Sequence, residues 1–213
     1  MIHKSKPNII NIDKDFKKAV SYAKELFLSG GIFIYPTDTI YGFGANPFNE
    51  DAKMKIAKVK GRDEWKRYIF LIQNVQLLQQ YVELNSEKHI DFLISIWPNP
   101  ISVVLKLNSK TSEILQSETG AFRVPNNRFC LKLLSEIQMP LISTSVNRSG
   151  NPPLLEQSLI IEEFGNEVDA IFYSDTKSYF EASTIIDLSR DKLELIREGK
   201  FKMDVLQNKL ESV

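Results

Sequence analysis

Two kinds of hydrophobic pattern alternate along this chain, and together they predict alternating strands and helices. Apolar residues recur every three or four positions from Phe16 to Phe27, which is the spacing of a helix that buries one face. Compact runs rich in β-branched and aromatic residues indicate buried strands. The expected strands are Ile9–Ile12, Ile32–Tyr35, Tyr68–Ile72, Ile101–Leu107, Ala121–Val124, Leu141–Ser145, Ala170–Tyr173, Thr184–Leu188 and Leu193–Arg197. The expected helices are Phe16–Phe27, Asp51–Lys60, Ser86–Trp97, Phe129–Ile137 and Leu159–Phe164.

Capping and turn residues separate these segments. Asp13 or Asp15 can cap the first helix, and the Gly30-Gly31 pair ends it. Residues 37–47 are predicted to form a turn-rich connection. The order of the elements predicts an α/β fold, with an open twisted mixed sheet and helices on its faces. We expect a single domain over residues 1–213, with a core of about 13–200.

The composition is typical of a water-soluble globular protein. Of the 213 residues 43% are hydrophobic, and 27 Lys and Arg balance 27 Asp and Glu, so the net charge suggests neither a nucleic-acid coat nor a membrane-surface protein. The single cysteine, Cys130, excludes an intrachain disulfide, and with only two histidines we expect no metal site. The N-terminus lacks the apolar core of a signal peptide, and no apolar stretch is long enough to span a bilayer. We therefore expect a cytoplasmic protein without membrane contact.

Two polar segments are the first candidates for a binding site. Residues 35–44 read YPTDTIYGFG, so hydroxyls, a carboxylate and two glycines follow a buried strand. Glycines let a backbone approach a ligand closely, although the same composition suits an ordinary turn. Lys60 and Arg62 flank Gly61 at the end of a predicted helix. Two such cations suit a phosphate group, and they equally suit the negative end of a helix.

A third polar segment follows the strand that begins at Leu141. Residues 143–150 read STSVNRSG, so hydroxyls and an amide come directly after apolar positions. Such side chains, with the N–H groups of a loop, can form a neutral phosphate cradle, or they can simply cap the strand through a turn. The remaining candidates are scattered beside predicted strands, and they are Thr119, Arg123, Ser183 and Arg197.

Several familiar catalytic motifs are absent from the sequence. It contains no GxxxxGK[ST] segment, and residues 42–44 lack the third glycine of a dinucleotide fingerprint. It contains no GxSxG segment, and neither histidine lies in a motif that would support a Ser-His-Asp triad. A Walker-type ATPase or a hydrolase with an activated nucleophile is therefore not expected.

Taken together, the polar segments resemble the YrdC/TsaC family, the threonylcarbamoyl-AMP synthases. The resemblance runs from about Phe16 to Lys200 and is carried by YPTDTIYGFGAN, KVKGR, WPNPISVVL, TGAFRVP, STSVNRSGNPP, ASTIIDL and IREG, in this order. It implies the YrdC-like (DHBP synthase-like) fold in its short form, with a concave, positively charged face. It also implies a nucleotidyltransferase that converts ATP, L-threonine and bicarbonate, with Mg²⁺, into threonylcarbamoyl-AMP and pyrophosphate. A tRNA threonylcarbamoyl-transferase machinery would then use this product for t6A37 modification of tRNA.

The resemblance also implies a role for each matching residue. Lys60 and Arg62 would be the catalytic pair that holds the ATP phosphates. Further ATP contacts would be made by Thr119, Ser145, Asn147 and Arg197. Threonine would be bound by Thr37, Arg123, Ser143 and Ser183, with Arg123 pairing with its carboxylate. The resemblance implies no metal ligand among the protein side chains.

The sequence departs from the family after Arg62, and two other functions remain open. Asp63 stands where the family usually has proline, and residues 66–69 also differ, which affects the loop on the threonine side. A concave basic face would equally suit a non-catalytic module that binds double-stranded RNA or tRNA through phosphate contacts. A carbamoyl-transfer enzyme is the other alternative, because a similar domain occurs in hydrogenase-maturation proteins. The zinc-finger cysteines of those proteins are absent from this sequence.

Overall fold

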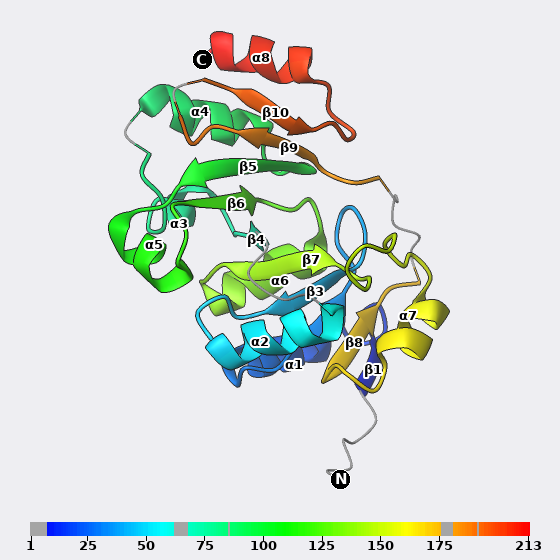
Figure 1. Ribbon diagram of the computed structural model, residues 1–213. Coiled ribbons are helices and arrows are strands. Elements are labelled where there is room, and N and C mark those ends of the chain that lie inside the picture. Colours follow the sequence, from blue (N-terminus) through cyan, green and yellow to red (C-terminus); the bar gives the residue numbers. More distant parts are fainter. Residues whose placement is uncertain (1–7, 62–67, 85, 176–180, 191) are drawn as a thin grey trace.

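The structure is a computed structural model that describes residues 8–61, 68–84, 86–175, 181–190 and 192–213. In this part of the chain, ten strands form one open sheet with helices on both faces (Figure 1). The strand order is β1-β8-β2-β3-β7-β4-β6-β5-β9-β10. The pairs β1–β8, β2–β8, β4–β6 and β5–β9 are parallel and the remaining pairs are antiparallel. The mixed α/β fold predicted from the sequence is confirmed.

The elements have the following bounds. The strands are β1 Asn8–Asn11, β2 Phe33–Tyr35, β3 Gly42–Ala45, β4 Ile69–Leu71, β5 Ile101–Lys106, β6 Thr119–Arg123, β7 Leu141–Ser145, β8 Ala170–Tyr173, β9 Thr184–Asp187 and β10 Glu194–Arg197. The helices are α1 Phe16–Leu28, α2 Glu50–Lys60, α3 Val75–Leu78, α4 Glu87–Ile96, α5 Ser109–Leu115, α6 Arg128–Ile137, α7 Gln157–Phe164 and α8 Met203–Glu211.

Side chains that alternate along the strands divide the core into two layers. On one face, α1 and α6 pack Phe27 and Leu134 against Phe33 and Phe172 of the sheet. On the other face, α2, α3, α4, α7 and α8 contribute to a larger cluster around Phe43. Burying a side chain of this kind stabilises the fold by about 1.5–3 kcal/mol, so both layers stabilise the sheet.

Most elements expected from the sequence are present, with ends that differ by one or two residues. Of the two possible caps for α1, Asp15 is the one used, since its side chain accepts a hydrogen bond from the Lys18 N–H. Ser86 precedes α4 as expected but makes no capping hydrogen bond with its side chain. The helices α3, α5 and α8 were not predicted.

The prediction for residues 37–47 is wrong in part, because Gly42–Ala45 forms the buried strand β3. Its two glycines hide the strand from sequence patterns, since glycine is normally depleted in strands. The reason for a small residue here is close packing. A Cβ atom on Gly44 would lie 2.6 Å from the Phe33 ring.

Both ends of the described chain extend beyond the expected core of residues 13–200. The strand β1 pairs with β8 at one edge of the sheet. At the other edge, α8 lies beside β10 and buries Leu206 and Leu210 in the larger cluster (Figure 1). Among the described residues, no helix is both long enough and apolar enough to cross a membrane.

Candidate functional site

Helices cover only part of the sheet face that carries α1 and α6. The strand residues of that core layer come from β2, β4, β7 and β8. Ile69 of β4 is paired with both Ser143 and Ala121, and Val104 is paired with both Ala121 and Asp187. Paired residues of neighbouring strands point to the same face of a sheet. The face that α1 and α6 cover at one end of the sheet therefore continues over β6, β5 and β9, where its side chains become polar.

The first polar group lies at the end of β7, where Lys60 reaches from α2 on the opposite face to meet Ser145 and Asn147. Lys60 ends α2, and its ammonium donates hydrogen bonds to the Ser145 and Asn147 carbonyl oxygens and to Asn147 Oδ1, the last at 3.0 Å. Ser145 Oγ donates to the same Oδ1 over 2.6 Å. Lys60 is fully buried, and a buried ammonium is tolerated only where oxygen atoms surround it in this way. The structure thus brings together three residues that lie far apart in the sequence.

Arg148 anchors the turn that carries Asn147. Its guanidinium forms ion pairs with Glu163 and Glu167, donates to the Val59 carbonyl and lies 4.6 Å from the centre of the Phe164 ring. The Ser149 N–H also donates to the Lys60 carbonyl over 2.7 Å. The turn after β7 is therefore attached to the end of α2 and to α7.

The second polar group joins the segment after β2 to the end of β6. Arg123 is buried; its Nη1 donates to Thr39 Oγ1 over 3.2 Å, and its Nη2 lies 3.4 Å from Asp38 Oδ1. Thr37 is also buried; its hydroxyl donates to the Ile40 carbonyl and accepts a hydrogen bond from the Thr39 N–H. The turn that starts at Thr37 is therefore folded onto Arg123.

The third group consists of Ser183, Ser102 and Arg197. Arg197 Nη2 donates to the Ser183 carbonyl over 2.7 Å and to Ser183 Oγ over 3.1 Å, and the Ser102 hydroxyl donates to Ser183 Oγ. Partial burial lowers the pKa of Arg197, and the nearby charge of Arg123 lowers it further. Two guanidinium groups that repel each other across a polar face are a suitable environment for an anion.

Ser143 lies on β7, and Gly42 of the neighbouring strand β3 leaves room for its hydroxyl. A Cβ atom on Gly42 would lie 2.9 Å from Ser143 Oγ, so a side chain at position 42 would displace this hydroxyl. The neighbouring Tyr35 is fully buried, and burial raises the pKa of its phenol well above the usual value. Tyr35 therefore stays neutral and supports this part of the face as an uncharged group.

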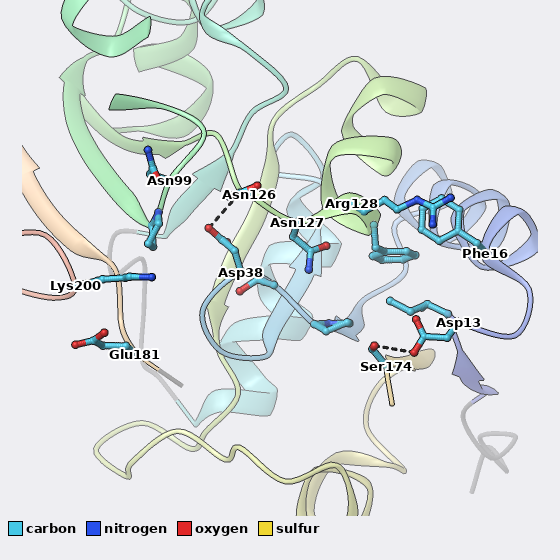
Figure 2. Close-up of a pocket in the computed structure, with 15 residues that line it drawn as sticks. Asp13, Phe16, Asp38, Asn99, Asn126, Asn127, Arg128, Ser174, Glu181 and Lys200 are labelled. Atoms are coloured by element: carbon cyan, nitrogen blue, oxygen red, sulfur yellow. Dashed lines mark hydrogen bonds between the residues drawn. The ribbon is translucent and has the colours of Figure 1, made fainter. Parts of the chain in front are cut away.

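A cavity of about 460 Å³ opens beside Thr37 and Asp38 (Figure 2). Its charged lining residues are Asp13, Asp38, Arg128, Glu181 and Lys200. Figure 2 shows Lys200 extending into the cavity and Asp38 bonded to the backbone of Asn126. In the same view Asp13 is turned toward Ser174, whose hydroxyl donates to its carboxylate over 2.8 Å. The volume is large enough for a small organic ligand.

Thr119 lies on the same face but away from Arg123. The two residues are four positions apart along β6, or roughly 13 Å. Thr119 lines a second cavity, of about 800 Å³, together with Lys106 and Asp187. Ser143 of β7 and Ala121 of β6 are both paired with Ile69 of β4, so the three residues form one row across the sheet. Ser145 and Thr119 lie two residues from this row on one side, and Arg123 lies two residues from it on the other side. Thr119 is therefore on the side of Ser145 rather than of Arg123.

The structure thus places nine of the ten candidate residues on one face of the sheet or at its border. Arg62 lies outside the described residues. The other nine form one group around Lys60, another around Arg123 and a third around Ser183, with Ser143 and Thr119 on the same face.

The comparison with protein-family models decides the family. The model for the Sua5/YciO/YrdC domain, described as telomere recombination, matches residues 25–199. The chain belongs to the Sua5/YciO/YrdC family. The resemblance read from the sequence motifs is therefore confirmed.

Solved structures of this family have the same fold. The chain is similar to Pyrococcus abyssi Sua5 in complex with L-threonine, with 25% identity and a TM-score of 0.85 over 94% of this chain. The match covers 60% of the Sua5 chain, so the present chain spans less than two thirds of that relative. It is also similar to Escherichia coli YciO, with 22% identity and a TM-score of 0.81 over 93% of this chain and 97% of that one. A third similar protein is MTH1692 of Methanobacterium thermoautotrophicum, with 30% identity, a TM-score of 0.64, and coverage of 86% and 88%.

Four residues of the site were not singled out from the sequence. Asp38 and Thr39 lie in a segment that was recognised as polar, but only the fold shows that both contact Arg123. Ser102 is a buried hydroxyl in an apolar strand, which was the one local sign of a role. Arg148 lies in the polar segment 143–150, but only the fold shows that it binds α7 and the end of α2.

Proposed function

We propose that this member of the Sua5/YciO/YrdC family is an L-threonylcarbamoyladenylate synthase. The reaction converts ATP, L-threonine and bicarbonate into threonylcarbamoyl-AMP and pyrophosphate. The observation that carries the proposal concerns Arg123, which is buried near Thr37. The Nε–H of Arg123 has no hydrogen-bond partner among the described residues. A buried, partly unpaired guanidinium suits the carboxylate of an amino acid. The similarity to a Sua5 structure that contains L-threonine supports the same ligand here.

Each group of residues has a proposed part in binding. Arg123 binds the threonine carboxylate, and Thr37, Ser143 and Ser183 surround the rest of the amino acid. Ser145, Asn147 and Thr119 bind the nucleotide. Arg197 lies between Ser183 and the nucleotide and contacts the latter.

The proposed chemistry needs no nucleophile from the protein. The threonine amine and bicarbonate form a carbamate with loss of water, and a carbamate oxygen attacks the α-phosphorus of ATP while pyrophosphate leaves. The site must hold two anionic reactants together and stabilise the charge that develops on pyrophosphate. Lys60 and Arg62 supply positive charge for this purpose. Lys60 does so from a buried position behind the Ser145–Asn147 turn.

The side chains that could act as metal ligands indicate how Mg²⁺ would be held. Among the described residues, no group of three or more His, Cys, Asp or Glu side chains could hold a metal ion. We propose that Mg²⁺ reaches the site on the phosphate oxygens of ATP, with water completing its coordination. The cation would reduce the repulsion between the triphosphate and the carbamate.

One experiment tests the function. Purified protein is incubated with ATP, Mg²⁺, bicarbonate and isotopically labelled threonine, and threonylcarbamoyl-AMP is sought by mass spectrometry. We expect the adenylate to form and pyrophosphate release to depend on threonine. Salt-sensitive RNA binding without threonine-dependent turnover would instead favour the RNA-binding alternative. AMP transfer that depends on carbamoyl phosphate would favour a carbamoyl-transfer enzyme.

The proposed downstream partner follows from the chemistry of one product, threonylcarbamoyl-AMP. Threonylcarbamoyl-AMP is a mixed anhydride of a carbamate and a phosphate, and we propose that a tRNA threonylcarbamoyl-transferase machinery consumes it for t6A37 modification. We propose that the chain acts in the cytoplasm, where tRNA, ATP and threonine are all available.

A further inference from the structure

Arg123 is held from two sides by residues of one turn. Its side chain is only 4% exposed, and Nη1 donates to Thr39 Oγ1 while Nη2 lies beside Asp38 Oδ1. The Asp38 side chain is 6% exposed, and its second oxygen, Oδ2, accepts a hydrogen bond from the Asn126 N–H over 3.1 Å. The carboxylate is thus fixed between the turn after β2 and the segment after β6, and it fixes the guanidinium in turn.

The contacts leave part of the hydrogen-bonding capacity of the guanidinium unused. An arginine side chain carries five N–H groups in a rigid plane, and the Nε–H and the nearer N–H of Nη2 point the same way. Thr39 occupies Nη1, whereas the Nε–H has no hydrogen-bond partner among the described residues. A carboxylate binds best to two parallel N–H groups. The buried Nε–Nη2 edge, whose Nε–H is unpaired among the described residues and whose Nη2 makes only the 3.4 Å ion pair, is therefore the part of Arg123 left to bind a carboxylate.

Asp38 also has unused bonding capacity. Its Oδ1 is buried and has no hydrogen bond in this part of the chain, because the 3.4 Å separation from Nη2 is an ion pair without a close hydrogen bond. An isolated buried guanidinium would be costly, and the carboxylate offsets that cost. Without Asp38 the side chain would lose both its countercharge and the contact that limits its rotation.

We propose that Asp38 is the positioning residue that turns the Nε–Nη2 edge of Arg123 toward the carboxylate of the amino-acid substrate. Asp38 acts through Arg123 and does not contact the substrate. The inference deepens the proposed function and rests on it. It explains how the site would select a free carboxylate over a neutral group of the same shape. A neutral carboxamide would place an NH₂ group against an N–H of Arg123, which repels it.

The test compares L-threonine with L-threoninamide, in which the carboxylate is replaced by an uncharged amide. Dissociation constants of both ligands are measured by isothermal titration calorimetry for the wild-type protein, Asp38→Asn and Asp13→Asn. The matched control Asp13 lines the same cavity but bonds to Ser174 and the Asp175 N–H rather than to Arg123. We expect Asp38→Asn to weaken threonine binding about 30-fold or more, because it removes one partner of a buried charge pair. Threoninamide binding should change less than about threefold, and Asp13→Asn should leave the ratio of the two constants unchanged.

Other outcomes would overturn the inference. If Asp38→Asn weakens both ligands equally, Asp38 supports the fold in general or binds the amine, which both ligands share. If it weakens neither, Arg123 needs no positioning. Should Asp38→Asn fail to fold by circular dichroism, Asp38→Glu keeps the charge but displaces it by one methylene. An unchanged preference for threonine in Asp38→Glu would likewise overturn the inference.

The same proteins separate this inference from the proposed function. A wild-type protein that makes no threonylcarbamoyl-AMP would overturn the proposed function. An active wild-type protein whose Asp38→Asn variant keeps its preference for threonine over threoninamide would overturn only the role of Asp38.

Discussion

The Arg197 guanidinium grips the Ser183 carbonyl with two hydrogen bonds, from Nη2 at 2.7 Å and from Nε at 3.2 Å. With Ile196 present, this contact requires an irregularity in β10, where the pairing shifts between Leu195 and Arg197. Leu195 is paired with Ile186, so a regular ladder would place Arg197 opposite Thr184, on the other face of the sheet. The β-bulge instead places Arg197 opposite Ile185, on the face of the site.

This geometry predicts that deleting the bulged residue, Ile196, is tolerated. Arg197 would then follow Leu195 directly and stay opposite Ile185 in a regular ladder, so its side chain would keep its direction. We expect the deletion variant to lose less than about threefold in threonine-dependent pyrophosphate release, whereas Arg197→Ala loses about 30-fold or more. A deletion variant as inactive as Arg197→Ala would show that the bulge itself is needed.

Lys60→Ala should reduce both activity and stability. The substitution leaves the Ser145 and Asn147 carbonyl oxygens without their donor inside the protein, at a cost of about 2–4 kcal/mol in the free energy of unfolding. Urea denaturation and pyrophosphate release measure the two effects. Lys58→Ala, on an exposed lysine of the same helix, is the control and should change neither. Full stability in Lys60→Ala would mean that the lysine does not organise the turn after β7.

Gly42→Ala should interfere with the threonine subsite through Ser143. The new methyl group would lie 2.9 Å from Ser143 Oγ and push that hydroxyl aside. We expect the KM for threonine to rise about fivefold to tenfold, with the KM for ATP nearly unchanged. If the effect acts through this hydroxyl, Gly42→Ala combined with Ser143→Ala should be no worse than Ser143→Ala alone. Additive losses would place the damage elsewhere in β3.

Cys130 should make the protein less stable in alkaline solution. Burial raises the pKa of its thiol well above the usual value, and the negative charge of Asp38 adds to this. The folded state therefore keeps a proton that the unfolded chain loses above roughly pH 8.5. The stability from this group is fully present below that pH and falls as the pH rises, by about 1.4 kcal/mol per pH unit.

Urea denaturation in reducing buffer from pH 7 to pH 10 measures this fall in stability. The decrease above about pH 8.5 should be shallower in Cys130→Ala, although that variant is less stable at pH 7 because of the cavity it creates. Tyr35 would contribute a similar decrease only above roughly pH 10, since burial also raises its pKa. Parallel pH curves for the wild-type protein and Cys130→Ala would contradict a buried, protonated thiol.

The sequence by itself determined the succession of elements and the chemical character of the site. Helical spacing gave α1, and apolar β-branched runs gave strands such as β7, because both patterns follow from the geometry of one local element. Hydroxyl and amide groups at the end of β7, and the cation at Lys60, predicted a site for an anion, which stays a prediction. The motif series also identified the family, which the match over residues 25–199 bears out.

Only the tertiary structure decided which of these groups meet and which way they point. β3 was missed because glycine is required there by close packing against Phe33 of the neighbouring strand β2. A contact with another strand cannot be read from a local sequence pattern. The pairing of Asp38 with Arg123 joins residues 85 positions apart, and the direction of Arg197 depends on a bulge in strand pairing. Such contacts depend on register and burial, which form only when the whole sheet assembles.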